Sequence, residues 1–110
     1  FLSCSFASAQ TVFVQSQCDM LSQLHGEIAM RVKRGEPDSK ILNEMFPKRQ
    51  GMPTDVQELI AIMLKVVHKD ARDTPTAEIQ EHVDAMQEYC YGNRGNVESM
   101  LNGLRSYVGK

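Results

Sequence analysis

The spacing of apolar residues along this chain constrains its fold more than any other feature. Apolar side chains recur at steps of three and four residues in five successive segments, which is the repeat of a helix with one buried face. No segment alternates apolar and polar residues as a half-buried strand does. The 110 residues, 42% of them hydrophobic, suit one domain. We therefore predict an all-α fold, a compact bundle of four to five helices.

Two helices are expected in the first half of the chain. The first covers about residues 12–33, and Gly35 followed by Pro37 ends it. The second is short, about residues 37–46, with Pro37 at its first helical position and Pro47 just beyond its end. The apolar stripe of the first helix comprises Val14, Cys18, Leu21, Leu24, Ile28 and Val32.

The third segment, from Thr54 to about Val67, carries the strongest helix signal. Thr54 and Gln57 have the spacing of a capping box, in which the two side chains satisfy free N–H groups of the first turn. Its apolar surface is wider than one neighbouring helix could cover, since it includes Val56, Leu59, Ile60, Ile62, Met63, Leu64, Val66 and Val67. We expect this helix to be the central one, packed on two sides.

The fourth helix is predicted to open at Thr74 and Pro75, an N-cap residue followed by proline, and to close at Gly92. Its buried stripe comprises Ile79, Val83, Met86 and Cys90. A fifth, shorter helix is predicted from Asn96, as its N-cap, to about Tyr107.

The cysteines predict one disulfide. Three are present, and if Cys4 is removed by processing, Cys18 and Cys90 remain as an even pair, which in an exported domain most simply forms a bridge. Closing so long a loop stabilises the folded state by about 4 kcal/mol in the chain-entropy treatment. The two helices that carry the pair would then run antiparallel. The alternative is a pair of buried free thiols.

The first nine residues resemble the end of a secretory signal peptide. They carry no charge and finish in Ala7-Ser8-Ala9, the pattern of small residues that signal peptidase accepts before its cleavage site. We therefore expect residues 1–9 to be a signal remnant, residues 10–110 to form a single helical domain, and the protein to be exported, in a bacterium to the periplasm. A frayed terminus of a cytosolic protein and a lipid anchor at Cys4 are the alternatives.

Charge and motifs exclude several classes of function. The formal net charge is −2 and the sequence contains no basic stripe, so nucleic acid is not an expected partner. No stretch is apolar enough to span a membrane. There is no nucleophile motif, no catalytic Cys pair and no phosphate loop in its proper context. We therefore expect no catalytic residues, no cofactor and no enzymatic activity.

The sequence likewise predicts no metal site. Its three histidines, His25, His68 and His82, lack the H-E-x-x-H or i,i+4 spacing of helical zinc ligands. Glu78 and His82 share a helix face and are expected to form a surface hydrogen bond. His25 interrupts an apolar stripe and is interpreted as a hydrogen-bonded histidine at the edge of the core. The seven methionines are scattered, which favours core packing over soft-metal binding.

One group of residues is a candidate binding patch. Two tyrosines flank Cys90, and a Gly-Asn loop with an arginine follows. Tyrosine and arginine are common anchors of protein interfaces. The predicted patch comprises Tyr89, Tyr91, Asn93 and Arg94, next to the disulfide, although ordinary packing at the end of a bundle also accounts for these residues.

Several short elements of the sequence resemble those of a group of short, exported, mostly uncharacterised proteobacterial proteins. The resemblance spans residues 18–90 and implies a periplasmic helical protein; it rests on Cys18, Arg31, 35–37, 66–68, 74–75 and 89–90. Periplasmic immunity proteins against type VI amidase effectors share this general build. So do periplasmic acid-stress chaperones, although their cysteines lie closer together.

The function that we expect is that of a non-enzymatic binding or interaction module. Its partner would be another protein, and one form of such a module is an immunity-type inhibitor of a toxin. The alternatives are an acid- or stress-responsive periplasmic chaperone and a small metal-handling protein.

Overall fold

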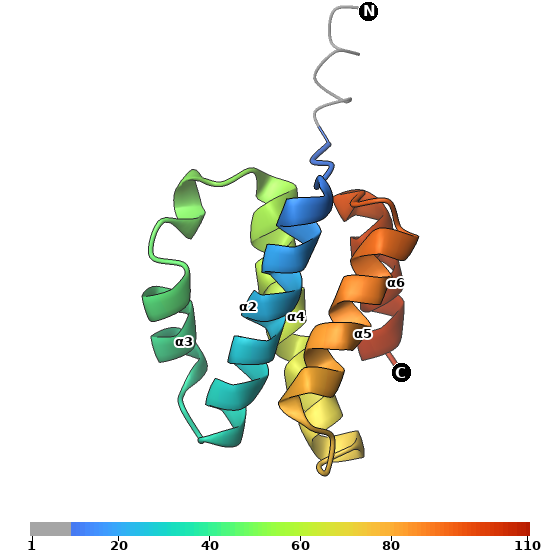
Figure 1. Cartoon of the computed structure of the whole chain (residues 1–110). Coiled ribbons are helices and arrows are strands. Elements are labelled where there is room, and N and C mark those ends of the chain that lie inside the picture. Colours follow the sequence, from blue (N-terminus) through green and yellow to red (C-terminus); the bar gives the residue numbers. More distant parts are fainter. Residues whose placement is uncertain (1–9) are drawn as a thin grey trace, which may run out of the picture.

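The structure is a computed structural model that describes residues 10–110, and the predicted signal remnant with Cys4 lies outside the described residues. The fold between Gln10 and Lys110 is all-α, as predicted, with five α-helices and no β-strand longer than an isolated bridge (Figure 1). The elements are α2 (Gln15–Lys33), α3 (Asp38–Met45), a 3₁₀ turn (Arg49–Gly51), α4 (Thr54–Asp73), α5 (Ile79–Gly92) and α6 (Val97–Val108).

The helices pack as two pairs. Helix α2 lies along α5, helix α4 lies along α6, and contacts between α2 and α4 join the pairs, while the short α3 covers one side of α2. Helix α4 therefore packs on two sides, as its wide apolar surface predicts. One core runs between the pairs, because the largest fully buried side chains come from four helices. They are Ile28, Ile41, Leu59, Met63 and Met100.

The disulfide joins the start of α2 to the end of α5, which confirms the predicted Cys18–Cys90 pair. The two Cα atoms are 5.6 Å apart, and both side chains are buried. Because the disulfide links the start of one helix to the end of the other, α2 and α5 run antiparallel (Figure 1). The periodicity that placed Cys90 on the inner face of its helix is thus confirmed.

Helix α2 begins three residues later than the spacing predicts. Residues 11–13 are extended instead and pair with the loop between α5 and α6 through a bridge between Val12 and Asn96. The predicted helix start fails here because main-chain hydrogen bonds to a distant loop compete with the first turn. Pro37 also lies one position outside its helix, because α3 starts at Asp38.

Two predicted caps are wrong. Thr54 is already inside α4, and the amide of Gln57 instead donates to the carbonyl oxygen of Met52, 2.8 Å away. Thr74 ends α4 rather than starting α5, because its N–H and its hydroxyl both donate to the Asp70 carbonyl. Helix α5 starts at Ile79, where the Glu81 carboxylate accepts the Glu78 N–H at 3.0 Å.

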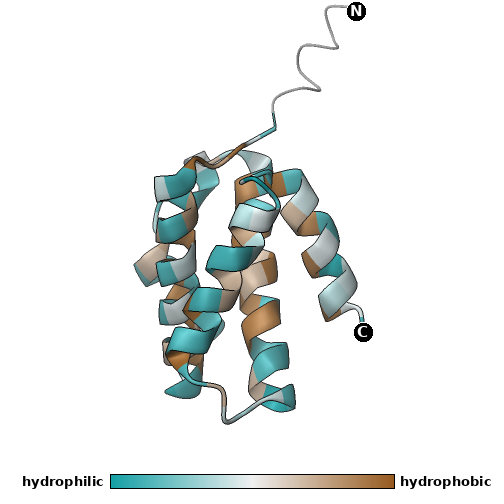
Figure 2. Ribbon diagram, turned by 45° about the vertical axis from the view of Figure 1, so that its right-hand side comes forward, coloured by the Kyte–Doolittle hydropathy of each residue, from teal (hydrophilic) through white to brown (hydrophobic). Residues whose placement is uncertain are grey.

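The cap of the last helix is as predicted, since the Asn96 side chain accepts the N–H of Ser99 at 2.8 Å. Figure 2 shows hydrophobic and hydrophilic residues alternating along the helices, the pattern of amphipathic helices around a core. In the part of the chain that the structure describes, no helix combines the length and apolarity needed to cross a membrane.

Candidate functional site

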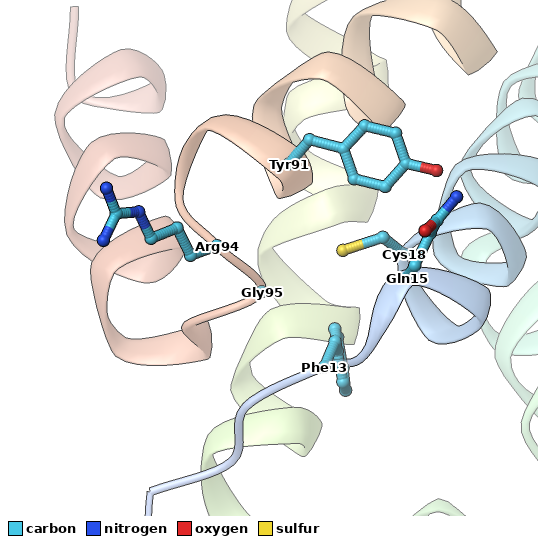
Figure 3. A pocket seen from close by; sticks show the side chains of 6 residues that line it. All are labelled: Phe13, Gln15, Cys18, Tyr91, Arg94 and Gly95. Carbon is cyan, nitrogen blue, oxygen red and sulfur yellow. The ribbon is translucent and has the colours of Figure 1, made fainter.

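A hollow opens beside the disulfide, at the end of the bundle where α2 begins and α5 ends. We call it the tip hollow; its volume is about 380 Å³, and it is lined by Phe13, Gln15, Cys18, Tyr91, Arg94 and Gly95 (Figure 3). Two of these residues, Tyr91 and Arg94, belong to the predicted binding patch. Phe13, from the extended segment 11–13, and Gly95, from the loop that this segment pairs with, form part of its lining.

The extended segment is held at both sides by hydrogen bonds. The N–H and the hydroxyl of Thr11 both donate to the Asp55 carboxylate, each at 2.9 Å, at the start of α4. On the other side, the Phe13 N–H donates to the Gly95 carbonyl at 2.7 Å, and the Val97 N–H donates to the Thr11 carbonyl at 3.1 Å. Segment 11–13, which contributes Phe13 to the tip hollow, is therefore fixed to the start of α4 on one side and to the α5–α6 loop on the other.

Gly95 is required for this arrangement. Its φ is +72°, and a Cβ atom built on it would lie 1.9 Å from the Phe13 carbonyl oxygen. We expect Gly95→Ala to lower the free energy of unfolding by about 2 kcal/mol, through left-handed strain and displacement of segment 11–13. Urea unfolding measures the loss, and hydrogen exchange should show a faster Phe13 amide. Gly51→Ala, at a glycine with open space around it, is the control and should expose the Phe13 amide no further.

Tyr91, at the end of α5, is hydrogen-bonded to α2 near the disulfide. Its hydroxyl donates to the Asp19 carboxylate on α2, which also accepts the Gln87 amide at 2.9 Å. The hydrogen bond from Tyr91 lowers the pKa of Asp19 most, and the bond from Gln87 lowers it further. The bond between Tyr91 and Asp19 also raises the pKa of Tyr91. Tyr91 is 40% exposed, so its side chain is held by the hydrogen bond to Asp19 but stays open to solvent.

The structure divides the predicted patch. Arg94 is exposed, and its side chain extends away from Tyr91 (Figure 3). Tyr89 is half-buried and donates its hydroxyl to the Met100 carbonyl at 2.7 Å, while the Asn93 amide donates to the Tyr89 carbonyl at 2.7 Å. Tyr91 and Arg94 therefore both line the tip hollow with their side chains directed apart. Tyr89 and Asn93 instead connect α5 to α6, since Asn93 also accepts the Ser99 hydroxyl at 2.6 Å.

Exposed apolar side chains gather at this same end. Among the described residues, the large hydrophobic side chains that stay exposed are those of Val12, Val14, Met20 and Tyr91, at 58%, 61%, 62% and 40%. Val12 lies in the extended segment, Val14 at the N-cap of α2, Met20 in the first half of α2 and Tyr91 near the end of α5. Figure 2 shows the segment that enters the bundle as a hydrophobic stretch.

A second cavity, of about 410 Å³, lies between α4, α5 and α6 and reaches α2. We call it the histidine cavity. It brings together three side chains that are far apart in the sequence: His25 from α2, Asp70 from α4 and His82 from α5. One potential ligand atom from each of these residues lies within 4.8 Å of the other two.

His25 differs from its prediction. It is 3% exposed, and its Nδ1 is the buried side-chain polar atom in residues 10–110 that has no hydrogen-bond partner. Burial, with a smaller contribution from nearby His82, lowers the pKa of His25 to about 4, so the imidazole is neutral at pH 7.

His82 is also buried, at 8% exposure, and has no surface hydrogen bond to Glu78, contrary to prediction. Its Nδ1 lies instead 3.7 Å from Oδ2 of Asp70. The other carboxylate oxygen of Asp70, Oδ1, accepts the hydroxyl of Tyr107 on α6. That hydrogen bond raises the pKa of Tyr107 to about 12.

The sequence held a signal for these histidines. His25 lies four residues after Leu21 and three before Ile28, both buried, and His82 lies four residues before buried Met86. Helical spacing therefore places both histidines at the inner faces of their helices. Helical spacing does not predict that Asp70 lies near both histidines, because that depends on how α4 packs against the α2–α5 pair.

Comparisons of this chain with protein families, curated proteins and solved structures give no match.

Proposed function

We propose that this chain is an exported, non-enzymatic binding module that recognises another protein through its tip surface. The tip surface is defined as the exposed side chains of Val12, Val14 and Tyr91, together with Arg94. The observation that carries the proposal is that exposed apolar side chains lie at the same end of the bundle as a preformed hollow, whose lining includes Tyr91 and Arg94. Apolar and aromatic side chains around a pocket, with an arginine beside them, are the usual anchors of protein interfaces.

Val14 gives a second, independent argument. It occupies the N-cap of α2, where its own side chain cannot accept a hydrogen bond from the first turn; the Gln17 side chain accepts the Val14 N–H at 2.9 Å, and α2 has no acidic residue in its first turn. Asp, Ser or Asn would stabilise this position, whereas valine contributes nothing to the cap. With 61% of its surface exposed, Val14 contributes little to the core either. A residue that breaks a local rule without a structural gain is expected at functional sites.

The charges at the tip define the kind of partner. Within residues 10–110, no carboxylate lies within 4.0 Å of the Arg94 guanidinium, so this cation is available to a bound molecule. The complementary surface would place an apolar side chain in the tip hollow and a carboxylate opposite Arg94. A toxin domain held by an immunity-type inhibitor is one such partner.

Export is part of the proposal. It is supported by the Cys18–Cys90 disulfide, a bond that persists in oxidising compartments, and by the small-residue pattern before Gln10. The intact mass of the protein recovered from the periplasmic fraction is expected to correspond to cleavage after Ala9 and to the loss of two hydrogens. A cytosolic product that retains residues 1–9 and reacts with thiol reagents at Cys18 and Cys90 would contradict export.

Val14→Asp is expected to separate stability from binding. The aspartate would cap α2 and raise the free energy of unfolding by about 1 kcal/mol, which is a rise in Tm of roughly 5 °C. The same charge would face the apolar partner and weaken binding at least tenfold. Thermal unfolding measures the first effect, and calorimetry with the identified partner measures the second.

The partner is identified by crosslinking in cells of the source organism. A photo-crosslinking residue at position 14 should give one major adduct, whereas the same residue at the exposed position 39 on α3 should not. The adduct partner, once purified, should bind wild type and Ser39→Asp equally and Val14→Asp at least tenfold more weakly. Equal adducts from both positions, or equal binding by all three proteins, would refute the tip surface.

A further inference from the structure

We propose that His25, Asp70 and His82 form a binding site for one divalent transition-metal ion of the zinc class. This inference concerns the histidine cavity, which lies apart from the tip surface, and it does not depend on the proposed function. Two imidazole nitrogens and one carboxylate oxygen are a usual protein ligand set for zinc. Three ligands from three helices, with a cavity beside them, match a site that leaves one position open.

The first argument is the convergence of the three donors. Ligand atoms about 2.0–2.2 Å from a tetrahedral zinc ion are roughly 3.4 Å from one another. Nδ1 of His82 and Oδ2 of Asp70 are 3.7 Å apart, which is close to that spacing without an ion. The whole set falls within 4.8 Å, and small rotations of the side chains would close the difference.

The second argument is the unpartnered nitrogen of His25. A buried polar atom without a hydrogen-bond partner costs free energy, and native proteins rarely keep one without a reason. In this structure, Nδ1 of His25 is such an atom, and its ring lies 6.1 Å from the ring of His82, centroid to centroid. One ring nitrogen of His25 lies within 4.8 Å of the candidate ligand atoms of Asp70 and His82. A metal ion bound through Nδ1 would give this nitrogen the partner that it lacks.

The third argument is the support of the carboxylate. A carboxylate that binds a metal through one oxygen normally accepts a hydrogen bond at its other oxygen, which holds the group in place. The Tyr107 hydroxyl donates to Oδ1 of Asp70, which leaves Oδ2 directed toward His82. Tyr107 therefore acts as a positioning residue for Asp70, from a fourth helix.

The cavity gives the site room for a fourth ligand. Three small residues contribute to the lining of the same cavity: Ala77, Ala85 and Gly103. A water molecule or a small anionic ligand could then complete the coordination of the ion. The site is thus of the open kind rather than the closed, four-ligand kind that serves structure alone.

The test uses the whole chain in its oxidised form, because Cys18 and Cys90 cannot bind the ion while they form the disulfide. A chelator first removes any bound metal. Calorimetry with Zn²⁺ should show one site. A hundredfold excess of Zn²⁺ over Kd should raise Tm by roughly 10 °C. Co²⁺ bound in place of Zn²⁺ should give the intense visible absorption of a four-coordinate site.

The variants assign the ligands. His25→Gln, Asp70→Asn and His82→Gln should each weaken Zn²⁺ binding at least a hundredfold, and Tyr107→Phe should weaken it by 10- to 100-fold. The matched control is His68→Gln, because His68 lies on α4 like Asp70 but is partnered with Asp38 at the surface. It should bind Zn²⁺ within twofold of wild type.

Several outcomes would overturn the site. These are the absence of Zn²⁺ and Co²⁺ binding by the wild type, a weak six-coordinate Co²⁺ spectrum, or equal binding by the wild type and Asp70→Asn. Loss of binding in His68→Gln would move the site to the protein surface. Circular dichroism of each metal-free variant shows whether it folds; Tyr107→Phe, which keeps all three ligands, tests the site even if a ligand variant unfolds.

Discussion

Replacing both Cys18 and Cys90 by alanine is expected to lower the free energy of unfolding by about 4 kcal/mol. The bridge closes a loop with a sequence separation of 72 residues, and the entropy that it removes from the unfolded chain corresponds to that amount. A domain of this size has a total stability of roughly 5–15 kcal/mol, so the variant would be near the limit of folding. Urea unfolding of the oxidised wild type and of the double variant measures the difference.

Reduction of the wild type provides the matching measurement. A thiol reductant should bring the wild type to the stability of the double variant and leave the double variant unchanged. If the double variant lost less than 1 kcal/mol, the α2–α5 pair would owe its stability to packing alone. The predicted dependence of the fold on an oxidising compartment would then fail.

The second large effect is a loss of stability in mild acid, caused by His25. The pKa of His25 is about 4 in the folded protein and about 6.5 when exposed, so between these values the unfolded chain binds a proton that the folded one does not. Stability is therefore complete above pH 6.5 and falls as the pH is lowered toward 4. The expected loss is roughly 3 kcal/mol in metal-free protein. The groups facing His25 are His82 on α5 and Asp70 on α4.

The variant His25→Leu isolates this effect. It removes the titrating group and should show a much flatter unfolding free energy between pH 6.5 and 4.5 in the presence of a chelator. The carboxyl groups of Asp19, Glu44 and Asp73 have lowered pKa values, so their contribution is lost only below about pH 4.5, as their ordinary values are 3.8 to 4.5. Parallel curves for wild type and variant between pH 6.5 and 4.5 would refute the assignment.

The fold was predictable where local spacing decides it. The inner faces of the helices, the Asn96 cap and the disulfide all follow from steps of three and four residues and from counting cysteines. The junction between α4 and α5 was not, because Thr74 followed by Pro75 has the sequence of a helix start. The same threonine ends the preceding helix by donating to the carbonyl of Asp70. A local pattern cannot distinguish the two, because the choice depends on how far α4 extends along its neighbours.

The candidate sites show the same division. Tyr91 and Arg94 could be predicted near the disulfide because they lie close to Cys90 in the sequence. Val14 could not be recognised as exposed, because the predicted helix included it in a buried stripe, whereas the chain is extended up to that point. The cluster of His25, Asp70 and His82 needs three helices to be placed relative to one another, which spacing within each helix does not provide.

The pairing of the helices gives the two cross-links different mechanical roles. The disulfide connects α2 to α5 and therefore lies within one pair of helices. It resists sliding of these two helices, whereas the boundary between the pairs is held by packing and has no covalent link within residues 10–110. The histidine cavity takes His25 and His82 from that pair and Asp70 from the other. An ion bound there would link the α2–α5 pair to the α4–α6 pair. The disulfide would then oppose sliding of α2 against α5, and the bound ion would oppose separation of the two pairs. The bundle would resist both motions only when the disulfide is formed and the ion is bound.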